Sequence, residues 1–200
     1  VEPVSIPYRG YDVWELPPNG QGIVALMALN ILNNFGPSQN DAESFHREIE
    51  AMKLAFADGH RYISDINTMD VSVKDLLSPA YGTDRAKLIT DKASLPTWGK
   101  PQTSGTVYMC AADGEGNMIS YIQSNFRGFG SGVVIPGTGI GMQNRGLGFN
   151  LEEGHPNCAA PGKRPYHTII PAFLTKDGNP VGPFGIMGGG MQPQAHVQVM

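Results

Sequence analysis

The sequence predicts an α+β protein in which helices come first and strands follow. The signals before about residue 100 are helical, and strand-like apolar runs begin after Gly105. The run from Thr106 to Ala112 is also apolar at nearly every position. A strand of this kind is covered on both faces, so we expect its sheet to lie between other layers.

Before residue 64 the pattern predicts two amphipathic helices, which are candidates for one covering layer. The segment GQGIVALMALNILNNFG ends at a Gly-Pro stop and has apolar residues at helical spacing: Val24, Met27, Ala28 and Ile31. The segment NDAESFHREIEAMKLAFADGHRYI has Asn40 as a predicted N-cap, with Glu43 three residues on. Its expected apolar stripe consists of Phe45, Ile49, Met52 and Phe56. Weaker patterns predict short helical turns around residues 73–77 and 84–89.

The second half of the chain carries the strand signals. The segment SLPTWGKPQTSG has no periodicity and predicts an exposed loop. After it, residues 106–112 and 118–124 predict two strands joined by the turn sequence DGEGN. Two further strands are expected around Asp177-Gly178, and QPQAHVQVM predicts the start of another helix.

The composition excludes several classes of function. The chain has 200 residues, 40% of them hydrophobic, with a formal net charge of -4. Its basic residues are scattered, so no nucleic-acid partner is expected, and no apolar run reaches the length of a membrane span. Only Cys110 and Cys158 are present, too few for a disulfide framework. The chain begins without Met and stops within an apolar pattern, so we expect an internal piece of a longer protein, with its localisation open.

Two common kinds of site are not expected, and a third stays open. The histidines are dispersed and show no HxxxH or HExxH spacing, so we expect no metal and no cofactor: His46, His60, His155, His167 and His196. Ser131 in FGSGV lacks the spacing of a GxSxG nucleophile elbow. The Gly cluster in GIMGGGMQPQ, at a strand-to-helix junction, suits either an anion-binding turn or a tight turn packed on a neighbour.

Thr106 is a candidate nucleophile. A threonine hydroxyl needs a base, and the free α-amine of the same residue serves as that base when Thr begins a chain. The sequence offers a loop that can be cut, a small residue before Thr106 and a strand behind it. The alternative is a threonine that only opens a strand.

Several separated motifs together point to one family. The segments YRGYDVWELPPNGQGIVALMALNILNNF, AMKLAFADGHRYISD, TVYMCAADGEGN, FGSGVVIPGTGI, APGKRP and GGG occur in this order over essentially the whole chain. Together they resemble the γ-glutamyltranspeptidase family, also called glutathione hydrolases, of the N-terminal-nucleophile hydrolase superfamily. The resemblance implies a four-layer αββα sandwich.

The resemblance also implies how the chain matures. Family members cut themselves before a threonine, which then becomes the nucleophile, so the implied scissile bond is Gly105–Thr106. Residues 1–105 would be the C-terminal part of a large subunit, and residues 106–200 the N-terminal part of a small one. The implied partners are a small-molecule amide and these two subunits of one precursor.

The family's catalytic residues match particular positions here. Backbone N–H groups of Gly188 and Gly189 match the family's oxyanion hole, which replaces the anion-turn interpretation of the Gly cluster. Ser124 falls where the family has a hydroxyl residue near the nucleophile, which would hold the new amine neutral and correctly aimed. Ser124 is alternatively only a polar strand residue.

The substrate-binding positions depart from the family pattern. Leu147 and Gly148 stand where the family has an acidic pair that grips the substrate amine. Phe126 replaces an Asn, which Asn125 would replace only if the strand slips. At the position of a Ser pair that contacts the carboxylate, the chain has His167 and Thr168.

These departures indicate a different acyl group. The pattern resembles a subgroup that includes oxamate amidohydrolases and cephalosporin-acylase-like proteins. There Arg145 would hold a small carboxylate bidentately, although it is alternatively a surface or structural arginine.

Three hypotheses about function remain. The first is a self-processing threonine hydrolase that passes a γ-glutamyl-type acyl group to water or an amine. The second is an amidohydrolase for a small carboxylate-bearing amide of the oxamate or glutaryl type. The third is an uncut binding protein without catalysis.

Overall fold

The computed structural model describes residues 1–37, 41–94 and 105–200. Its elements in chain order are β1 (Val4–Tyr8), β2 (Tyr11–Glu15), α1 (Gly22–Leu32), α2 (Asp41–Tyr62), η1 (Ile66–Thr68), α3 (Val73–Leu76), α4 (Pro79–Ala86), β3 (Gly105–Ala112), β4 (Met118–Phe126), η2 (Arg145–Gly148), β5 (Ala172–Lys176), β6 (Asn179–Phe184), η3 (Gly189–Met191) and α5 (Gln192–Val199). The predicted cap Asn40 and residues 95–104 of the predicted loop lie outside the described residues.

A four-stranded antiparallel sheet forms the main body, in the order β1-β2-β5-β6. The expectation of helical structure before about residue 100 was wrong for the first 15 residues, which form the β1–β2 hairpin. Its tight turn places Arg9 and Gly10 at positive φ, +48° and +85°, which suits the twist of a two-residue hairpin. The two strands predicted around Asp177-Gly178 are confirmed as β5 and β6, and the predicted final helix is confirmed as α5.

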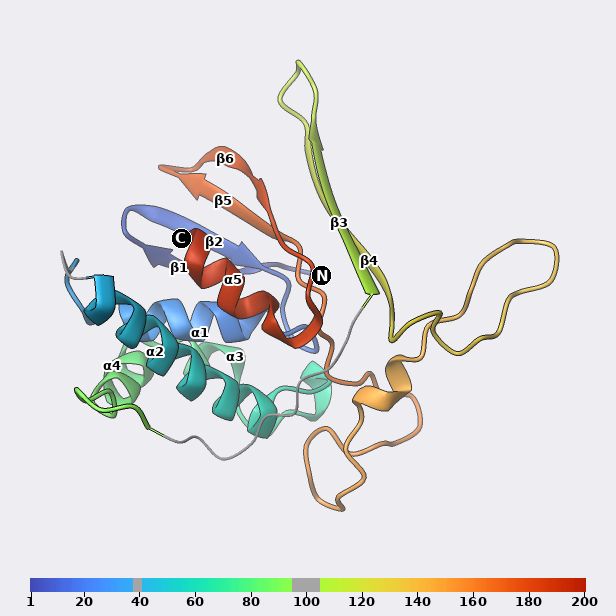
Figure 1. Cartoon of the computed structure of the whole chain (residues 1–200), viewed down its shortest axis with the longest axis horizontal. Helices are drawn as coiled ribbons and strands as arrows, with labels where there is room; N and C mark the ends of the chain where they lie inside the picture. Colours follow the sequence, from blue (N-terminus) through green and yellow to red (C-terminus); the bar gives the residue numbers. More distant parts are fainter. Residues whose placement is uncertain (38–40, 95–104) are drawn as a thin grey trace.

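Helix α1 is the centre of the core. It contacts β1 and β2 on one side and α2, α4 and α5 on others, and Figure 1 shows it running beside α2 beneath the sheet. All eleven of its residues are buried, so the predicted amphipathic character was wrong although the helix itself was correctly placed. Its one amide, Asn30, donates to the Ser78 carbonyl at 2.9 Å, which ties the start of α4 to the core.

Helix α2 packs on α1 through small residues. Its predicted apolar stripe was correct in part: Met52 is buried and Phe56 packs against the core, whereas Phe45 and Ile49 are exposed. The fully buried positions are Ala51 and Ala55. A Cβ placed on Gly59 would lie 2.6 Å from Val24 Cγ2, so the two helices approach too closely there for a larger side chain. Phe45 and Ile49, nearer the start of the helix, lie outside this close contact.

The β3–β4 hairpin stands apart from the main body, and Figure 1 shows it extending away from the four-stranded sheet. Its outer face carries Val107, Met109, Ile119 and Tyr121, each more than 40% exposed. Its inner face contacts the segment after β6, where a Cβ on Gly185 would lie 2.4 Å from the Tyr108 ring. The hairpin is thus covered on one face by the described residues, and the four-layer arrangement stays a prediction.

Candidate active site

Thr106 and Ser124 face each other across the β3–β4 hairpin. They are partners in the strand register, and the Thr106 Oγ1 hydroxyl donates to Ser124 Oγ at 3.2 Å. Ser124 Oγ also accepts the backbone N–H of Phe126 at 2.9 Å, which turns the end of β4. The register shifts between Gly105 and Thr106, so Thr106 begins the regular part of the ladder.

The Gly cluster lies on the segment that packs against the inner face of this hairpin. Tyr108 shares the strand face of Thr106, and its ring contacts Gly185, three residues before Gly188. Gly188 and Gly189 both have positive φ, +145° and +62°. Neither N–H donates a hydrogen bond within the part of the chain that the structure describes. Two adjacent unpaired N–H groups in this conformation can receive an anionic oxygen.

Gln21, just before α1, ties the Gly cluster to the loop that carries His167 and Thr168. It is fully buried, and its Nε2 donates to the Thr168 carbonyl at 2.6 Å and to the Gly189 carbonyl at 2.9 Å. Its backbone N–H donates to the His167 carbonyl at 2.8 Å, and its Oε1 accepts from Tyr166 at 3.1 Å. Sequence reasoning missed Gln21, because nothing in NGQG marks this amide as buried.

Arg145 packs on the ring of Phe126, which is two residues after Ser124 in β4. Its side chain is 4% exposed, and its guanidinium lies 4.8 Å above the Phe126 ring. Nη1 donates to Thr168 Oγ1 at 2.6 Å, so two predicted site residues are in direct contact. Burial lowers the pKa of Arg145 to about 10, which leaves the guanidinium charged at neutral pH.

His167 contributes no charge at neutral pH. Burial, with the positive charge of Arg145 as a second cause, lowers the pKa of His167 to about 4. The imidazole is therefore neutral beside the guanidinium, and the charge of this region is that of Arg145.

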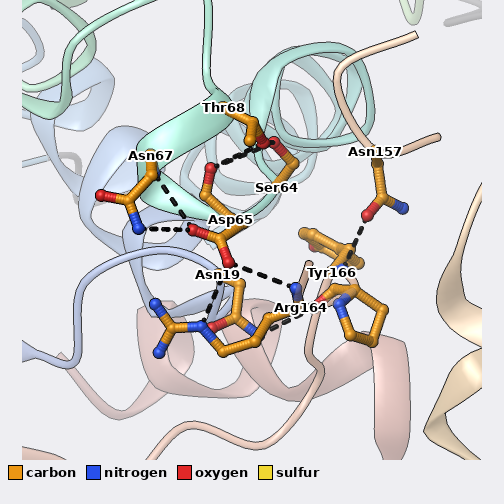
Figure 2. Close-up of polar contacts among 9 residues, drawn as sticks. Asn19, Ser64, Asp65, Asn67, Thr68, Asn157, Arg164 and Tyr166 are labelled. Atoms are coloured by element: carbon orange, nitrogen blue, oxygen red, sulfur yellow. Dashed lines mark hydrogen bonds and ion pairs between the residues drawn. The ribbon is translucent and has the colours of Figure 1, made fainter. Parts of the chain in front are cut away.

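A buried carboxylate holds the loop that presents these residues. Figure 2 shows Asp65 accepting from the backbone N–H and side chain of Asn67, both at 3.1 Å. Its other oxygen accepts from the Arg164 backbone N–H at 3.2 Å and from Nε at 3.3 Å. The pKa of Asp65 is lowered, chiefly by its hydrogen bond from the Asn67 backbone. Asp65 thereby fixes the start of the 164–168 loop to the end of α2, a role that sequence reasoning did not anticipate.

Asn125 lies on the other side of β4. It borders a surface hollow of about 450 Å³ together with Val107, Gln123, Ser124, Ile140 and Gly141. Strand alternation turns it away from Phe126, so it does not join Arg145 and Thr168. Its predicted role would have to be exercised from this hollow.

The two positions expected to be acidic cannot serve an amine as they stand. Leu147 is 57% exposed. A Cβ on Gly148 would lie 2.9 Å from the Tyr166 carbonyl oxygen, so this position has no room for a side chain without a shift of the backbone. The 164–168 loop closes over it through Asn157, whose amide joins the Gly148 carbonyl and the Tyr166 N–H.

These contacts form one connected site. The hairpin brings Thr106 to Ser124, Phe126 links Ser124 to Arg145, and Thr168 and Gln21 continue the path to Gly189. Of the predicted site residues, Asn125 is the one whose side chain turns away from this path. Within the described ranges there is no group of three His, Cys, Asp or Glu residues placed to hold a metal ion. No described helix is long and apolar enough to cross a membrane.

Comparisons with known proteins agree on one family. The gamma-glutamyltranspeptidase family model matches residues 1–200. The glutathione hydrolase-like YwrD proenzyme of Bacillus subtilis is 40% identical over 99% of this chain and 38% of its own length. The oxamate amidohydrolase proenzyme of Klebsiella pneumoniae is 39% identical over 96% of this chain and 37% of its own.

A solved structure is similar throughout. The cephalosporin acylase from Bacillus halodurans has 59% sequence identity and a TM-score of 0.93, covering 100% of this chain and 37% of that one. The chain therefore spans less than two fifths of the length of these relatives.

Proposed function

Because this chain belongs to the gamma-glutamyltranspeptidase family, whose similar members are enzymes made as proenzymes, we propose that it is the catalytic part of a self-cutting threonine amidohydrolase. The observation that carries the proposal is the pairing of Thr106 and Ser124 at 3.2 Å, on a strand whose face packs against the Gly-cluster segment. The named relatives act as hydrolases or acylases, which supports an amide-cleaving reaction.

The proposed reaction has two steps. After cleavage of Gly105–Thr106, the new α-amine takes the proton of the Thr106 hydroxyl, whose oxygen attacks the amide carbonyl. The C–N bond then breaks, the amine leaves with that proton, and the acyl group remains as an ester on Thr106. Water or a second amine attacks the ester and releases the acid or a new amide.

Three other groups would assist this reaction. The N–H groups of Gly188 and Gly189 would donate to the oxyanion, and removing one such donor typically slows a reaction by about 100-fold or more. The Ser124 hydroxyl, already beside Thr106, would orient the new amine. Asn125, Arg145, His167 and Thr168 would contact the substrate.

The acyl group has two candidates. A γ-glutamyl-type amide is the first, since glutathione hydrolase is a name carried by similar proteins of this family. A small carboxylate-bearing amide of the oxamate or glutaryl type is the second. The exposed Leu147 and the crowded Gly148 favour it, because neither can bind the ammonium group of a glutamyl substrate.

The proposed subunits would stay interlocked. Residues 1–105 and 106–200 would be the ends of the large and small subunits that meet at the cut. Both parts contribute strands to the four-stranded sheet, with β2 paired to β5.

The test is the denatured mass spectrum of the full-length protein beside its Thr106→Ala variant. We expect two polypeptides that meet at Gly105–Thr106 in the unchanged protein and one uncut polypeptide in the variant. Incubation of the cut protein with a chromogenic anilide should then add the acyl mass to the piece that begins with Thr106.

Thr103→Ala is the matched control, because it removes the preceding threonine in the sequence and should leave the cut in place. An uncut chain from well-folded unchanged protein would overturn the mechanism and support the binding-protein hypothesis. Cleavage without any acylated piece would leave maturation intact and reject the proposed acyl transfer.

A further inference from the structure

The Arg145 guanidinium is a buried cation with most of its donors unused. Its side chain is 4% exposed, and Nη1 is bonded to Thr168 Oγ1. The atoms Nε and Nη2 are buried and have no hydrogen-bond partner among residues 1–37, 41–94 and 105–200. A buried charge without such partners is strongly unfavourable, which suggests that a partner arrives from outside this set of residues.

The two unused nitrogens are the ones that suit a carboxylate. The Nε–H and one Nη2–H of arginine point the same way and form a side-on fork that receives both oxygens of a carboxylate in parallel. Thr168 occupies the other side of the guanidinium, and the Phe126 ring covers one face. The fork is thus the remaining polar edge of Arg145.

No carboxylate of this chain fills the fork. The described residues place none within hydrogen-bonding distance of Nε or Nη2. Residues 38–40 and 95–104, which the structure does not describe, contain neither Asp nor Glu. The missing partner is therefore not an acidic side chain of these 200 residues.

The surroundings of the fork also disfavour an ammonium group. His167 is neutral at pH 7, and the positions that would supply negative charge hold Leu147 and Gly148. An amine placed beside Arg145 would meet a like charge and no anion, whereas a carboxylate would meet its complement.

Arg145 is linked to Thr106 through two residues of β4. Ser124 contacts Thr106 directly, and Phe126, which carries Arg145 on its ring, is two strand residues further, roughly 7 Å along β4. A carboxylate at the end of a short acyl group would therefore approach Arg145 along β4, past Phe126.

We infer that Arg145, held by Thr168 and Phe126, is the residue that determines acyl-group specificity: its fork binds a carboxylate of a short acyl group that lacks an α-amine. This inference rests on the proposed function and chooses the carboxylate-bearing amide over the γ-glutamyl amide. Nε and Nη2 are covered in the structure, so the carboxylate reaches them as neighbouring groups move aside.

Calorimetry with glutarate and L-glutamate tests the inference on the full-length protein, because these two probes differ only by the α-ammonium group. We expect glutarate to bind more tightly than glutamate. Arg145→Met should weaken glutarate binding by about 100-fold, the loss typical of a buried charge-assisted pair, and bring the two affinities together. Arg145→Lys, which keeps the charge but loses the fork, should fall between them.

Arg127→Met is the matched control. Its guanidinium also lies over the Phe126 ring, at 5.5 Å, but it is exposed, so this variant should keep the preference for glutarate. Unchanged glutarate affinity in folded Arg145→Met would overturn the inference, as would tighter binding of glutamate by the unchanged protein. If Arg145→Met does not fold, the Arg145→Lys affinities decide in the same way.

Binding does not require catalysis, so this result is separate from the mass spectrum that tests the proposed function. Loss of cleavage with intact, Arg145-dependent glutarate selectivity would reject the proposed function alone. Normal cleavage and acylation with no effect of Arg145 would reject the inference alone.

Discussion

Helix α1 and the β3–β4 hairpin use their apolar residues in opposite ways. Every residue of α1 is buried between the sheet and three helices. In the hairpin, the apolar residues of the outer face are exposed, while the inner face carries Thr106 and Ser124. The helix therefore supports the fold, and the hairpin presents the candidate chemistry.

The difference shows where the site obtains its rigidity. The hairpin touches the main body at few places, with Tyr108 on Gly185 among them. The loops that complete the site are instead anchored to the core, by Gln21 at the start of α1 and by Asp65 after α2. Substitutions in the core should lower stability, and substitutions in the hairpin should change chemistry at nearly constant stability.

The largest effect should come from removing core volume. Leu26→Ala in the full-length protein should lower the free energy of unfolding by about 3 kcal/mol, because Leu26 is fully buried and its loss leaves a cavity. Chemical denaturation followed by circular dichroism gives this value.

Val107→Ala on the hairpin is the comparison variant. Val107 is 48% exposed, and its truncation should change stability by less than about 0.5 kcal/mol. Equal losses in the two variants would show that the outer face of the hairpin is buried in the full-length protein, which would break the comparison.

A smaller effect is expected where the site loop joins the core. Asp65→Ala removes the charged acceptor of the Asn67 and Arg164 backbone N–H groups and should lower stability by about 2 kcal/mol. Because the pKa of Asp65 is lowered in the folded protein, this contribution is present at neutral pH and is lost as the pH falls through the folded pKa. Urea denaturation at pH 7 and at pH 3 measures both.

Asp84→Ala is the control for Asp65→Ala. The Asp84–Lys87 ion pair is largely exposed, so it should contribute less than about 0.5 kcal/mol to the free energy of unfolding. If Asp65→Ala also weakens glutarate binding while Asp84→Ala does not, the loop contact positions Arg145 and Thr168. A destabilised variant with normal glutarate affinity would restrict Asp65 to a structural role.

A separate effect should be a pH dependence from His167. Its folded pKa of about 4 lies below the ordinary value of 6.5, so the unfolded chain binds a proton first as the pH falls. Stability from this group is fully present above pH 6.5 and is lost between pH 6.5 and 4. His167→Gln should flatten this part of the stability profile measured by urea denaturation.

His46→Gln is the control variant, because it removes a histidine on α2 whose ring is bonded to the Thr90 carbonyl. A profile of His167→Gln that parallels that of the unchanged protein would mean that the pKa of His167 is not lowered in the folded protein.

The elements were predictable where a single local pattern determined them. The β5–β6 turn at Asp177-Gly178 and the helix after the Gly cluster follow from turn residues and from the end of a strand. The β1–β2 hairpin was missed, although VSIPY and YDVWE flank Arg9-Gly10 as two short strands would. The helical pattern of the following segment is longer than either of these strands and dominates this part of the sequence.

Burial was predicted less well because it depends on what packs against each face. Helix α1 is apolar all round, a pattern typical of a central helix, and only the contacts with both sheet and helices reveal this. In α2 the closest packing is made by Ala51, Ala55 and Gly59, which a pattern of large apolar residues does not report, and Phe45 and Ile49 of the expected stripe are exposed.

The candidate site was predicted residue by residue, but its connections were not. Motif resemblance identified Thr106, Ser124 and Arg145, and the structure places them along one path. Gln21 and Asp65 are more than 40 residues away from them in sequence. Gln21 and Asp65 bond to loops that are distant in sequence and come together only in the folded chain, so no local sequence pattern predicts these contacts.

The pairing of β2 with β5 has a consequence for the order of events. Trp14 Nε1 donates to Thr175 Oγ1 at 3.0 Å across these strands, which lie on opposite sides of the predicted cut. A sheet assembled while the chain is continuous forms by a one-molecule process. The same sheet lost after the cut could be recovered only when two separate polypeptides meet, at a rate that falls on dilution. The uncut chain would therefore fold readily, whereas the cut protein, once unfolded by heat, would refold poorly on cooling at low concentration.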